Sequence, residues 1–241
     1  MAIEYEVTGT TSELTVRLSG ALGLTDVADV HIHLLKALAE QPEAVLVDVS
    51  ALTVDQPLAL AVFTAASRQA ARWPGIPVLV YGAQPPVHAL LTGPAYHRLP
   101  VFAGVEAARA AVGATLPALS EELLPVTGAP RHARDVATEA CLRWDLPGLV
   151  APASLIANEL VSNVVDHAHT MMTLRVSLRP RYLNIAVRDG SPAEPLRPGP
   201  AVAGLNRGRG LLLVDASAHA WGWMPSADGK VVWASLARPR D

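Results

Sequence analysis

A helical segment that is mostly apolar but carries one line of polar side chains restricts the fold of this 241-residue chain more than any other feature. In NELVSNVVDHA, residues 158–168, Glu159, Asn163 and His167 recur every four residues among apolar neighbours. Four helical steps advance about 40°, so the three polar groups share one stripe. The pattern predicts a helix that packs on a core and presents a carboxylate, an amide and an imidazole to one polar site.

The composition indicates a packed globular protein, with 51% hydrophobic and 17% charged residues. No apolar run approaches the ~18 residues of a membrane span, and the first residues lack the basic and apolar regions of a signal peptide. Cys141 is the only cysteine, so no intrachain disulfide forms. We therefore expect a cytoplasmic protein without membrane contact. The net charge of -3 also argues against direct nucleic-acid binding.

The first 112 residues alternate strand and helix patterns. The run AVLVDVS, residues 44–50, predicts a strand buried on both faces. Pro57 suits the first turn of a helix over residues 57–73. Further strands are expected at residues 3–7, 14–20, 76–82 and 99–104, and further helices at 25–40, 85–93 and 105–113. This pattern predicts an α/β layer fold.

The second half has a different pattern. Helices are expected at residues 131–144 and 152–168 and from Gly210 to Ala220, and strands at 171–180, 182–190 and 230–239. This order predicts an α/β sandwich with a mixed, largely antiparallel sheet and helices on one face. Pro and Gly are frequent between the halves, at residues 113–130. The fold class is two-domain α/β, with domains at 1–114 and 125–241 and a linker at 115–124.

Three stretches of the second half carry groups that suit nucleotide chemistry. A helix that begins after Gly208-x-Gly210 offers backbone N–H groups to phosphates. Asp189, at a strand end, can accept a hydrogen bond from the amine of adenine. The Asn163 amide oxygen suits Mg²⁺, and Glu159 can accept a proton from an attacking hydroxyl.

Each stretch also has a plain structural interpretation when it is taken alone. A polar side chain such as His167 often marks the solvated edge of a helix, and Asp189 before a glycine is a common turn sequence. The Gly208-x-Gly210 pair is neither a complete dinucleotide-binding fingerprint nor a phosphate-binding loop with a following Gly-Lys pair. The order of the three stretches is therefore more informative than any one of them.

In this order, ELVSNVVDHA, VRDGSP and GRGLLLVDASAHAWGW resemble the Bergerat-type (GHKL), or histidine kinase-like, ATPase domain of anti-sigma-factor serine kinases, over residues 125–237. The resemblance implies that Glu159 is the catalytic base, that Asn163 is the Mg²⁺ ligand and that His167 lies near the phosphates or the lid. ATP and Mg²⁺ are the implied cofactors, and residues 193–207 the implied ATP lid. The other implied nucleotide-binding residues are Asp189, Gly190, Gly208, Arg209, Gly210 and Leu211.

One position departs from that family's pattern. Histidine kinases and related proteins usually have a second glycine after Asp-x-Gly, whereas this chain reads Asp189-Gly190-Ser191-Pro192. Pro192 stiffens the loop and supplies no N–H group.

The first half, through AVLVDVSALTVDQPLALAVFTAASRQAARWPGIPVLVYG, resembles the STAS domain of anti-sigma-factor antagonists over residues 3–112. In that family a strand ending Asp-x-Ser is followed by Asp-Ser-Ser-Gly, whose second serine accepts phosphate. Asp48-Val49-Ser50 matches the first element, but the second reads Asp55-Gln56-Pro57-Leu58. Pro57 has no hydroxyl, so this position cannot be phosphorylated. The resemblance implies that this half docks on a kinase-type domain, in the same chain or in a dimer mate.

The two resemblances together predict an ATP-binding regulatory protein of the partner-switching type. It would act as a serine protein kinase on a STAS-type antagonist protein, with a sigma factor as a further partner, and as a homodimer. Two alternatives stay open at this point. The chain could be a non-catalytic module that binds ATP, or no nucleotide, and sequesters a partner, or its first half could sense a small molecule.

Overall fold

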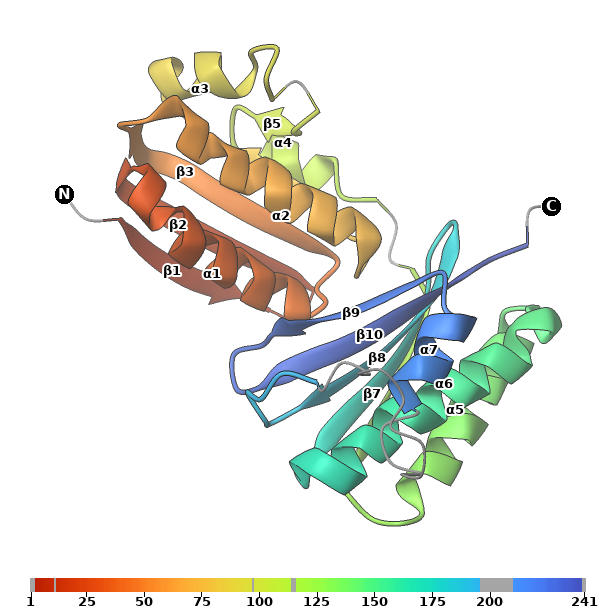
Figure 1. Cartoon of the computed structure of the whole chain (residues 1–241). Helices are drawn as coiled ribbons and strands as arrows, with labels where there is room; N and C mark the ends of the chain where they lie inside the picture. Colours follow the sequence, from red (N-terminus) through yellow and green to blue (C-terminus); the bar gives the residue numbers. More distant parts are fainter. Residues whose placement is uncertain (1–2, 11, 97, 114–115, 196–209, 240–241) are drawn as a thin grey trace. The chain divides into compact units, whose positions relative to one another are not determined.

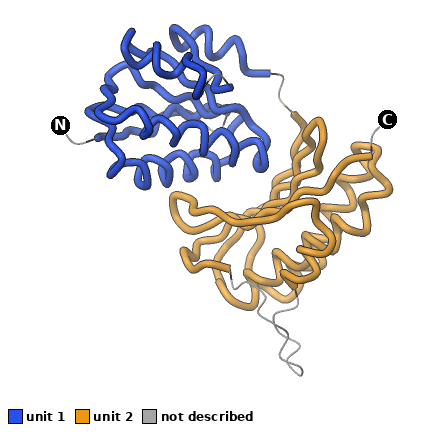
Figure 2. Tube along the Cα trace, turned by 45° about the horizontal axis from the view of Figure 1, so that its top comes forward, with its two compact units in different colours: residues 1–115 blue, residues 116–241 orange. Residues whose placement is uncertain are grey.

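The computed structural model describes residues 3–10, 12–96, 98–113, 116–195 and 210–239. The chain divides into two compact units, Met1–Thr115 and Leu116–Asp241 (Figure 1, Figure 2). Each unit contains one five-stranded sheet with its own helices. The predicted fold class, two-domain α/β, is therefore confirmed.

The sheet of the first unit is mixed. Its strands follow one another in chain order, with β1 antiparallel to β2 and every later neighbour parallel. Parallel neighbours require crossover helices, which cover both faces and bury the central strands. The strands are β1 (Glu4–Gly9), β2 (Glu13–Leu22), β3 (Ala44–Val54), β4 (Val78–Tyr81) and β5 (Val101–Phe102).

The helices of the first unit cover both faces of its sheet. Figure 1 shows α1 and α2 side by side on one face. Leu46 and Leu79 project to the other face, where they form a cluster with Ala108 of α4. Every residue from Ala44 to Val49 is consequently buried, as the apolar run predicts. The helices are α1 (Val27–Ala39), α2 (Ala61–Arg72), α3 (Pro85–Leu91) and α4 (Val105–Ala110), and short 3₁₀ turns at Leu24–Asp26 and Pro57–Leu60 precede α1 and α2.

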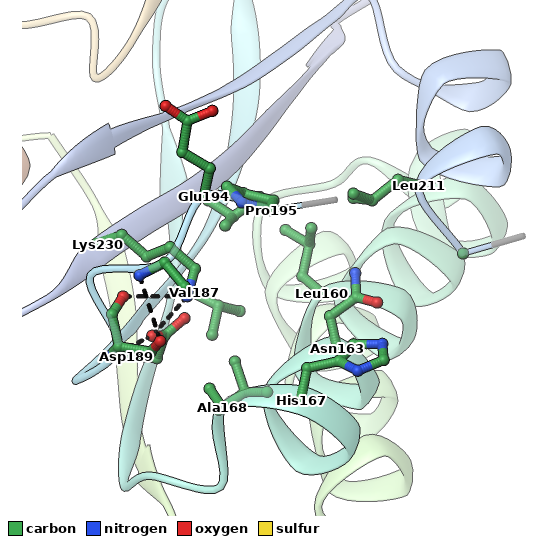
Figure 3. Close-up of a pocket in the computed structure, with 15 residues that line it drawn as sticks. Leu160, Asn163, His167, Ala168, Val187, Asp189, Glu194, Pro195, Leu211 and Lys230 are labelled. Carbon is green, nitrogen blue, oxygen red and sulfur yellow. Dashed lines mark hydrogen bonds and ion pairs between the residues drawn. The ribbon is translucent and has the colours of Figure 1, made fainter. Parts of the chain in front are cut away.

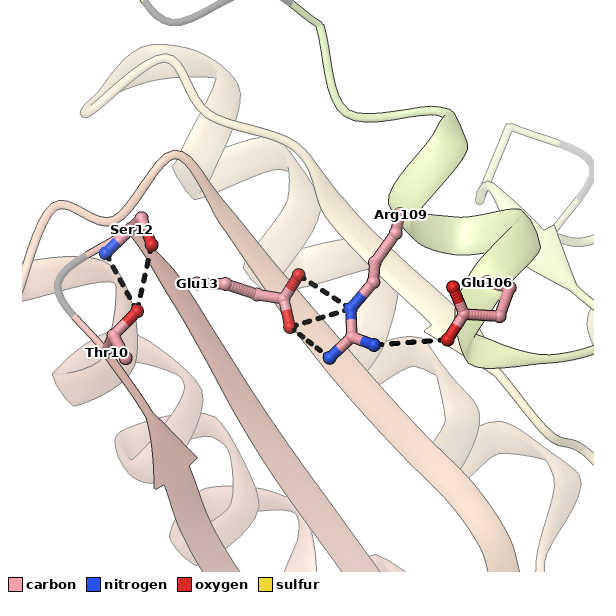
Figure 4. Close-up of polar contacts among 5 residues, drawn as sticks. All are labelled: Thr10, Ser12, Glu13, Glu106 and Arg109. Atoms are coloured by element: carbon pink, nitrogen blue, oxygen red, sulfur yellow. Dashed lines mark hydrogen bonds and ion pairs between the residues drawn. The ribbon is translucent and has the colours of Figure 1, made fainter.

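An exposed cation on α4 links this helix to the second strand (Figure 4). The Arg109 guanidinium donates to the Glu13 carboxylate at 2.8 Å and to Glu106 Oε1 at 3.2 Å. Surface pairs of this kind contribute little stability, roughly 0–1 kcal/mol, so apolar packing accounts for most of the attachment of α4.

The sheet of the second unit is antiparallel throughout its described strands, in the order β6-β7-β8-β10-β9. A short connection joins β7 to β8, so the expected hairpin is present. The strands are β6 (Ala118–Leu123), β7 (Met172–Leu178), β8 (Tyr182–Asp189), β9 (Ala220–Pro225) and β10 (Lys230–Ala237).

The helices of the second unit lie on one face of its sheet (Figure 1). They are α5 (Ala129–Arg143), α6 (Val150–Asn163) and α7 (Gly210–Ser217). A 3₁₀ turn at Pro147–Leu149 precedes α6, and a π-helical turn at Val164–Ala168 follows it. Leu160 and Val161 of α6 pack against Val176 and Ile185 of the sheet in one apolar core. This core fixes the polar stripe of α6 at a defined position beside the sheet.

Two parts of the second unit differ from the sequence expectation. The expected linker, residues 115–124, contains β6, which pairs with β7 and buries Leu123 opposite Met172. The expected helix from Gly210 ends at Ser217, and residues 220–225 form β9 instead. Side chains alternate between the two faces of β9, and Gly222 pairs with Trp233 of β10. A Cβ atom on residue 222 would come within 2.9 Å of the Trp233 indole ring, so glycine fits there.

The helical stretch Pro147–Ala168 is long and apolar enough to cross a membrane by length and composition, and the described residues contain no other such helix. Its buried side chains, among them Ile156 and Val164, belong to the core of the second unit. The core helix of a globular domain meets the same two criteria, so we interpret this stretch as that core helix.

Candidate functional site

A cavity of about 480 Å³ lies between the C-terminal half of α6, the end of β8 and the start of β10 (Figure 3). Figure 3 shows Asp189 and Lys230 on one side of it and Asn163 and His167 on the other. Its size suits a nucleotide-sized ligand. The lining residues are Leu160, Asn163, Val164, His167, Ala168, Val187, Asp189, Ser191, Ala193, Glu194, Pro195, Gly210, Leu211, Lys230 and Val232.

The polar stripe of α6 is divided between this cavity and its border. Asn163 and His167 line the cavity, and His167 lies in the π-helical turn that ends the helix. Glu159, one turn earlier, is half-buried and is not among the lining residues. Its carboxylate lies against the start of α7, because a Cβ atom on Gly210 would come within 2.6 Å of Glu159 Oε2. The three groups are therefore neighbours along one edge of the cavity.

The Glu159 carboxylate is oriented by its neighbour in sequence. Asn158 Nδ2 donates to Glu159 Oε1 at 3.0 Å, while Asn158 Oδ1 accepts from Arg134 Nη1 of α5 at 2.6 Å. These two hydrogen bonds fix Glu159 Oε1 and leave Glu159 Oε2 facing Gly210. A side chain at this position would displace the Glu159 carboxylate from its place beside α7.

The opposite side of the cavity contains a buried ion pair. Asp189, the last residue of β8, is only 2% exposed, and Lys230, the first residue of β10, is 7% exposed. Lys230 Nζ donates to Asp189 Oδ1 at 2.9 Å and to the Ser191 carbonyl oxygen at 3.1 Å. The Ser191 N–H donates to the same Asp189 oxygen at 2.8 Å. These bonds offset the cost of burying two charges, which is several kcal/mol for each ion.

Two contacts hold the turn after Asp189 in place. The Gly190 N–H donates to Thr170 Oγ1 at 3.0 Å, which ties this turn to the segment after the π-helical turn. A Cβ atom on Gly229 would come within 2.0 Å of the Asp189 carbonyl oxygen. Gly229 thus lets the turn before β10 pack directly on the backbone that carries Asp189.

The donor set of the cavity fits a nucleotide with a magnesium ion. Asp189 Oδ2 can accept a hydrogen bond from a ligand, and Val187, Val232 and Leu160 supply apolar surface. Among the described residues no group of three His, Cys, Asp or Glu side chains could hold a metal ion. Mg²⁺ often takes few protein ligands and keeps phosphate and water oxygens, so the Asn163 amide oxygen is a suitable single ligand.

Some predicted site residues lie outside the described part of the chain. Gly208 and Arg209 belong to residues 196–209, as does most of the predicted lid. Gly210 and Leu211 are described and line the cavity, as do Ala193, Glu194 and Pro195 at the start of the predicted lid. Gly190 lies beside the cavity, in the turn that follows Asp189.

Sequence reasoning missed Lys230, Gly229 and Thr170. Lys230 is one of only two lysines in the chain, and it follows an Asp-Gly turn directly before the last strand. Those two facts make the residue unusual in the sequence, but they do not show that it lies beside Asp189. Its position depends on the pairing of β10 with β8, which sets Lys230 opposite Asp189 across 41 residues of chain.

The first unit contains the second predicted motif. Pro57 begins the 3₁₀ turn before α2, and its carbonyl oxygen accepts from the Tyr96 hydroxyl at 2.9 Å. Gln56 Oε1 accepts from the Leu24 N–H at 2.8 Å. Leu58 is 73% exposed and Leu24 is 51% exposed. The segment where the related motif has its serines is thus a 3₁₀ turn with one exposed leucine, Leu58, and it is hydrogen-bonded to the turn that carries the exposed Leu24.

Two family models match the chain. The model described as Mlab, STAS domain matches residues 6–93, and the model described as histidine kinase-like ATPase domain matches residues 127–236. An uncharacterized protein of Streptomyces coelicolor is 37% identical over 78 residues, which are 31% of this chain and 74% of that protein.

Two solved structures are also similar. An anti-sigma factor antagonist from Mycobacterium paratuberculosis has 20% identity and a TM-score of 0.38, covering 46% of this chain and 94% of that one. The phosphorylated Bacillus cell fate determinant SpoIIAA has 13% identity and a TM-score of 0.37, covering 46% and 100%. The two family matches identify the chain as a STAS domain joined to a histidine kinase-like ATPase domain, a combination typical of partner-switching regulatory proteins.

Proposed function

We propose that the second unit binds Mg·ATP and phosphorylates a serine of a separate STAS-type antagonist protein. The observation that carries the proposal is the division of polar groups around one cavity. Asp189 lies on one side, where it can accept from the adenine amine, and Asn163 lies on the other, beside Glu159 and the start of α7. A nucleotide that spans the cavity would have its base and its phosphates at these two sides.

In this proposal each side chain has a stated task. ATP would supply the phosphoryl group, and Mg²⁺ would neutralise part of the negative charge on the phosphates. Asn163 would hold the metal ion through its amide oxygen, and the N–H groups at the start of α7 would donate to the phosphate oxygens. Glu159 takes the serine proton while the serine oxygen bonds to the γ-phosphorus and ADP leaves. The contact from Asn158 keeps the Glu159 carboxylate oriented for that proton.

Calorimetric titration of the full chain with ATP and Mg²⁺, beside an Asn163→Ala variant, tests the binding step. We expect binding by the unmodified chain and a loss of at least about tenfold in the variant, which is 1.4 kcal/mol. The Asn158→Ala variant is a matched control, because it removes an amide from the same helix that does not line the cavity. Absence of binding by the unmodified chain would contradict the proposal.

Phosphate transfer to a purified antagonist protein tests the chemical step. Glu159→Gln should keep ATP affinity and lower the transfer rate by about 10²-fold or more, since a positioned general base contributes that much. An unchanged transfer rate would remove the assignment of Glu159. ATP binding without transfer to any antagonist would support the alternative, a non-catalytic module that sequesters an antagonist or a sigma factor.

We also propose that the first unit docks on a kinase-type domain, in the same chain or in a dimer mate, and that it cannot be released by phosphorylation. Pro57 supplies no hydroxyl, and the exposed Leu58 and Leu24 provide apolar surface on two turns that the Leu24–Gln56 hydrogen bond joins. Leu58→Asp, with Leu142→Asp on the second unit as a matched exposed control, should weaken association with an isolated kinase-type partner. Equal association of both variants would contradict the docking assignment.

A further inference from the structure

We propose that Lys230 determines the base specificity of this cavity by donating a hydrogen bond to N1 of adenine, beside the Asp189 carboxylate that accepts from N6. The inference rests on the proposed binding of Mg·ATP by the second unit and adds one direct contact to the base. Lys230 and Asp189 line the same side of the cavity (Figure 3).

The Lys230 ammonium group has one N–H donor that the protein does not use. An ammonium has three N–H donors and no acceptor. One donates to Asp189 Oδ1 at 2.9 Å and another to the Ser191 carbonyl oxygen at 3.1 Å. Among the described residues the third N–H has no acceptor. Because Lys230 lines the cavity, a ligand bound there can supply that acceptor.

The Asp189 carboxylate has one unused acceptor beside that donor. Its Oδ1 atom accepts from both Lys230 Nζ and the Ser191 N–H, and within the described part of the chain Oδ2 accepts no hydrogen bond. The backbone of Ser191 thus holds both members of the pair, since its N–H donates to Asp189 and its carbonyl oxygen accepts from Lys230. The acceptor and the donor therefore meet a ligand in a fixed order.

Adenine matches this order. Its amine at N6 is a donor, and the neighbouring N1 is an acceptor on the same edge of the ring. When N6 donates to Asp189 Oδ2, N1 lies next to that contact, on the edge where the unused N–H of Lys230 can donate to it. Both polar groups of the buried pair are then satisfied, as buried polar groups in proteins generally are.

An oxopurine meets the same pair in the opposite order. Guanine and hypoxanthine have an acceptor at O6 and an N1–H donor. In the position of adenine, O6 would face the Asp189 carboxylate and N1–H would face the Lys230 ammonium, so neither group would have a partner. A buried site built to hydrogen-bond a ligand group rejects an analogue that leaves it unpaired by 10⁴-fold or more. Lys230 thus adds a second mismatch to the one that Asp189 alone would impose.

Calorimetry on the unmodified full chain with Mg²⁺ and three triphosphates tests the proposal. The analogue 1-deaza-ATP keeps the amine but lacks the N1 acceptor, and ITP carries O6 and N1–H. We expect 1-deaza-ATP to bind at least about tenfold more weakly than ATP, because it loses a hydrogen bond from a charged donor, and ITP at least about 100-fold more weakly. A loss of less than tenfold for 1-deaza-ATP would overturn the proposal, as would a loss of less than 100-fold for ITP.

The outcomes separate this proposal from the one it rests on. Equal binding of ATP and 1-deaza-ATP defeats only the assignment of Lys230 and leaves its contact with Asp189 as a structural ion pair. Failure of ATP to bind defeats the nucleotide site itself, and the inference with it.

A pair of lysine variants assigns the contact to one residue. Lys230→Met removes the donor, and Lys36→Met removes the other lysine of the chain, which lies on α1 of the first unit. The ratio of the 1-deaza-ATP Kd to the ATP Kd should fall at least about fivefold in Lys230→Met and stay within about twofold in Lys36→Met. Losses of affinity common to both nucleotides cancel in this ratio. A smaller fall in a folded Lys230→Met protein would overturn the assignment.

A spectroscopic measurement keeps the proposal testable if Lys230→Met does not fold. In the Lys36→Met protein labelled with ¹⁵N-lysine, Lys230 gives the one lysine ammonium signal, because the chain has two lysines. We expect saturating Mg·ATP to shift this signal and to slow exchange of the ammonium protons with water, and Mg·1-deaza-ATP to do so less. Equal changes with both nucleotides would overturn the proposal, because a lysine that only holds Asp189 in place would not respond to N1.

Discussion

The two units contain the same local arrangement, an aspartate in an Asp-x-Ser sequence whose carboxylate accepts from the serine N–H. In the first unit Asp48 Oδ1 accepts from the Ser50 N–H at 2.9 Å. In the second unit Asp189 Oδ1 accepts from the Ser191 N–H at 2.8 Å. Both aspartates are buried, at 4% and 2% exposure, and each has a basic partner. The difference lies in the second carboxylate oxygen.

Asp48 uses both of its oxygens within the protein, since Oδ2 accepts from Arg17 Nε at 3.1 Å. Burial alone would raise the pKa of the Asp48 carboxyl group, but the bonds from Ser50 and Arg17 outweigh it and the pKa is lowered. Asp189 uses one oxygen for Ser191 and Lys230, and its other oxygen is available to the cavity. A buried carboxylate with both oxygens satisfied stabilises a fold, whereas one with a free oxygen beside a cavity is suited to bind a ligand.

The strongest test of this comparison replaces each aspartate by asparagine. We expect Asp189→Asn to weaken ATP binding by about 100-fold or more, because it removes a charged acceptor and leaves Lys230 buried without its partner. Asp48→Asn should leave the ATP Kd within about twofold, because its carboxylate has no free oxygen to offer. Calorimetry with Mg·ATP measures both constants. Similar losses in both variants would show that the comparison does not separate ligand binding from fold stability.

Sequence reasoning found Asp189 at the end of an apolar strand-like run and Asp48 through the Asp-x-Ser element that resembles STAS domains. It could not rank them, since the count of hydrogen bonds on each carboxylate depends on Arg17 and Lys230. Arg17 reaches Asp48 across the pairing of β2 with β3, and Lys230 reaches Asp189 across the pairing of β8 with β10. Long-range strand register has no local signal, so the partners became visible only in the structure.

The fold was predictable to a similar extent. Long apolar or periodic runs such as β3 and α6 were identified, whereas β6 and β9 were missed. Strand β6 is an edge strand with one buried residue, Leu123, and so has little apolar alternation. Strand β9 contains Gly222, whose role is to admit the Trp233 ring, a contact that depends on the tertiary structure.

A second prediction concerns the stability that Asp48 provides. Asp48→Asn should destabilise the region of β3 by about 2 kcal/mol at pH 7, through loss of charged hydrogen bonds to a partner that is itself solvent-exposed. Hydrogen exchange of the peptide that contains residues 44–54, compared between the two proteins at equal pH, measures this difference.

The pH dependence of that difference has a definite sign. The pKa of the folded Asp48 carboxyl group lies below its ordinary value of 3.8, so its stabilisation is complete above that value and is lost as the pH falls through the folded pKa. The gap between unmodified and Asp48→Asn proteins should therefore shrink as the pH falls below 3.8. A gap that stays constant over this range would show that the charge of Asp48 contributes nothing.

A third prediction concerns the side of the cavity opposite Asp189. Gly210→Ala adds a Cβ atom within 2.6 Å of Glu159 Oε2, so the carboxylate has to move. We expect phosphate transfer to fall at least about tenfold, because small displacements of a catalytic group lower rates strongly. The ATP Kd should change less, since Asp189 and Lys230 are unaffected. Gly104→Ala, at a glycine with open space around it, is the matched control. Equal losses of transfer rate and ATP affinity would contradict this prediction, because they would show that Gly210 affects only nucleotide binding.

The smallest effect comes from Cys141, a third buried titratable group and one with no charged partner. Burial raises the pKa of its thiol to about 11, the opposite direction from Asp48. Because the unfolded thiol ionises near pH 9, stability should decline as the pH rises from about 9 to about 11, by about 0.4 kcal/mol at pH 9 itself. Chemical denaturation at pH 7, 9 and 10 measures this decline, and Cys141→Ala, which lacks the thiol, should show a smaller one. Equal declines in both proteins would mean that burial without a partner leaves the thiol unperturbed, and the contrast with Asp48 would then rest on its hydrogen bonds alone.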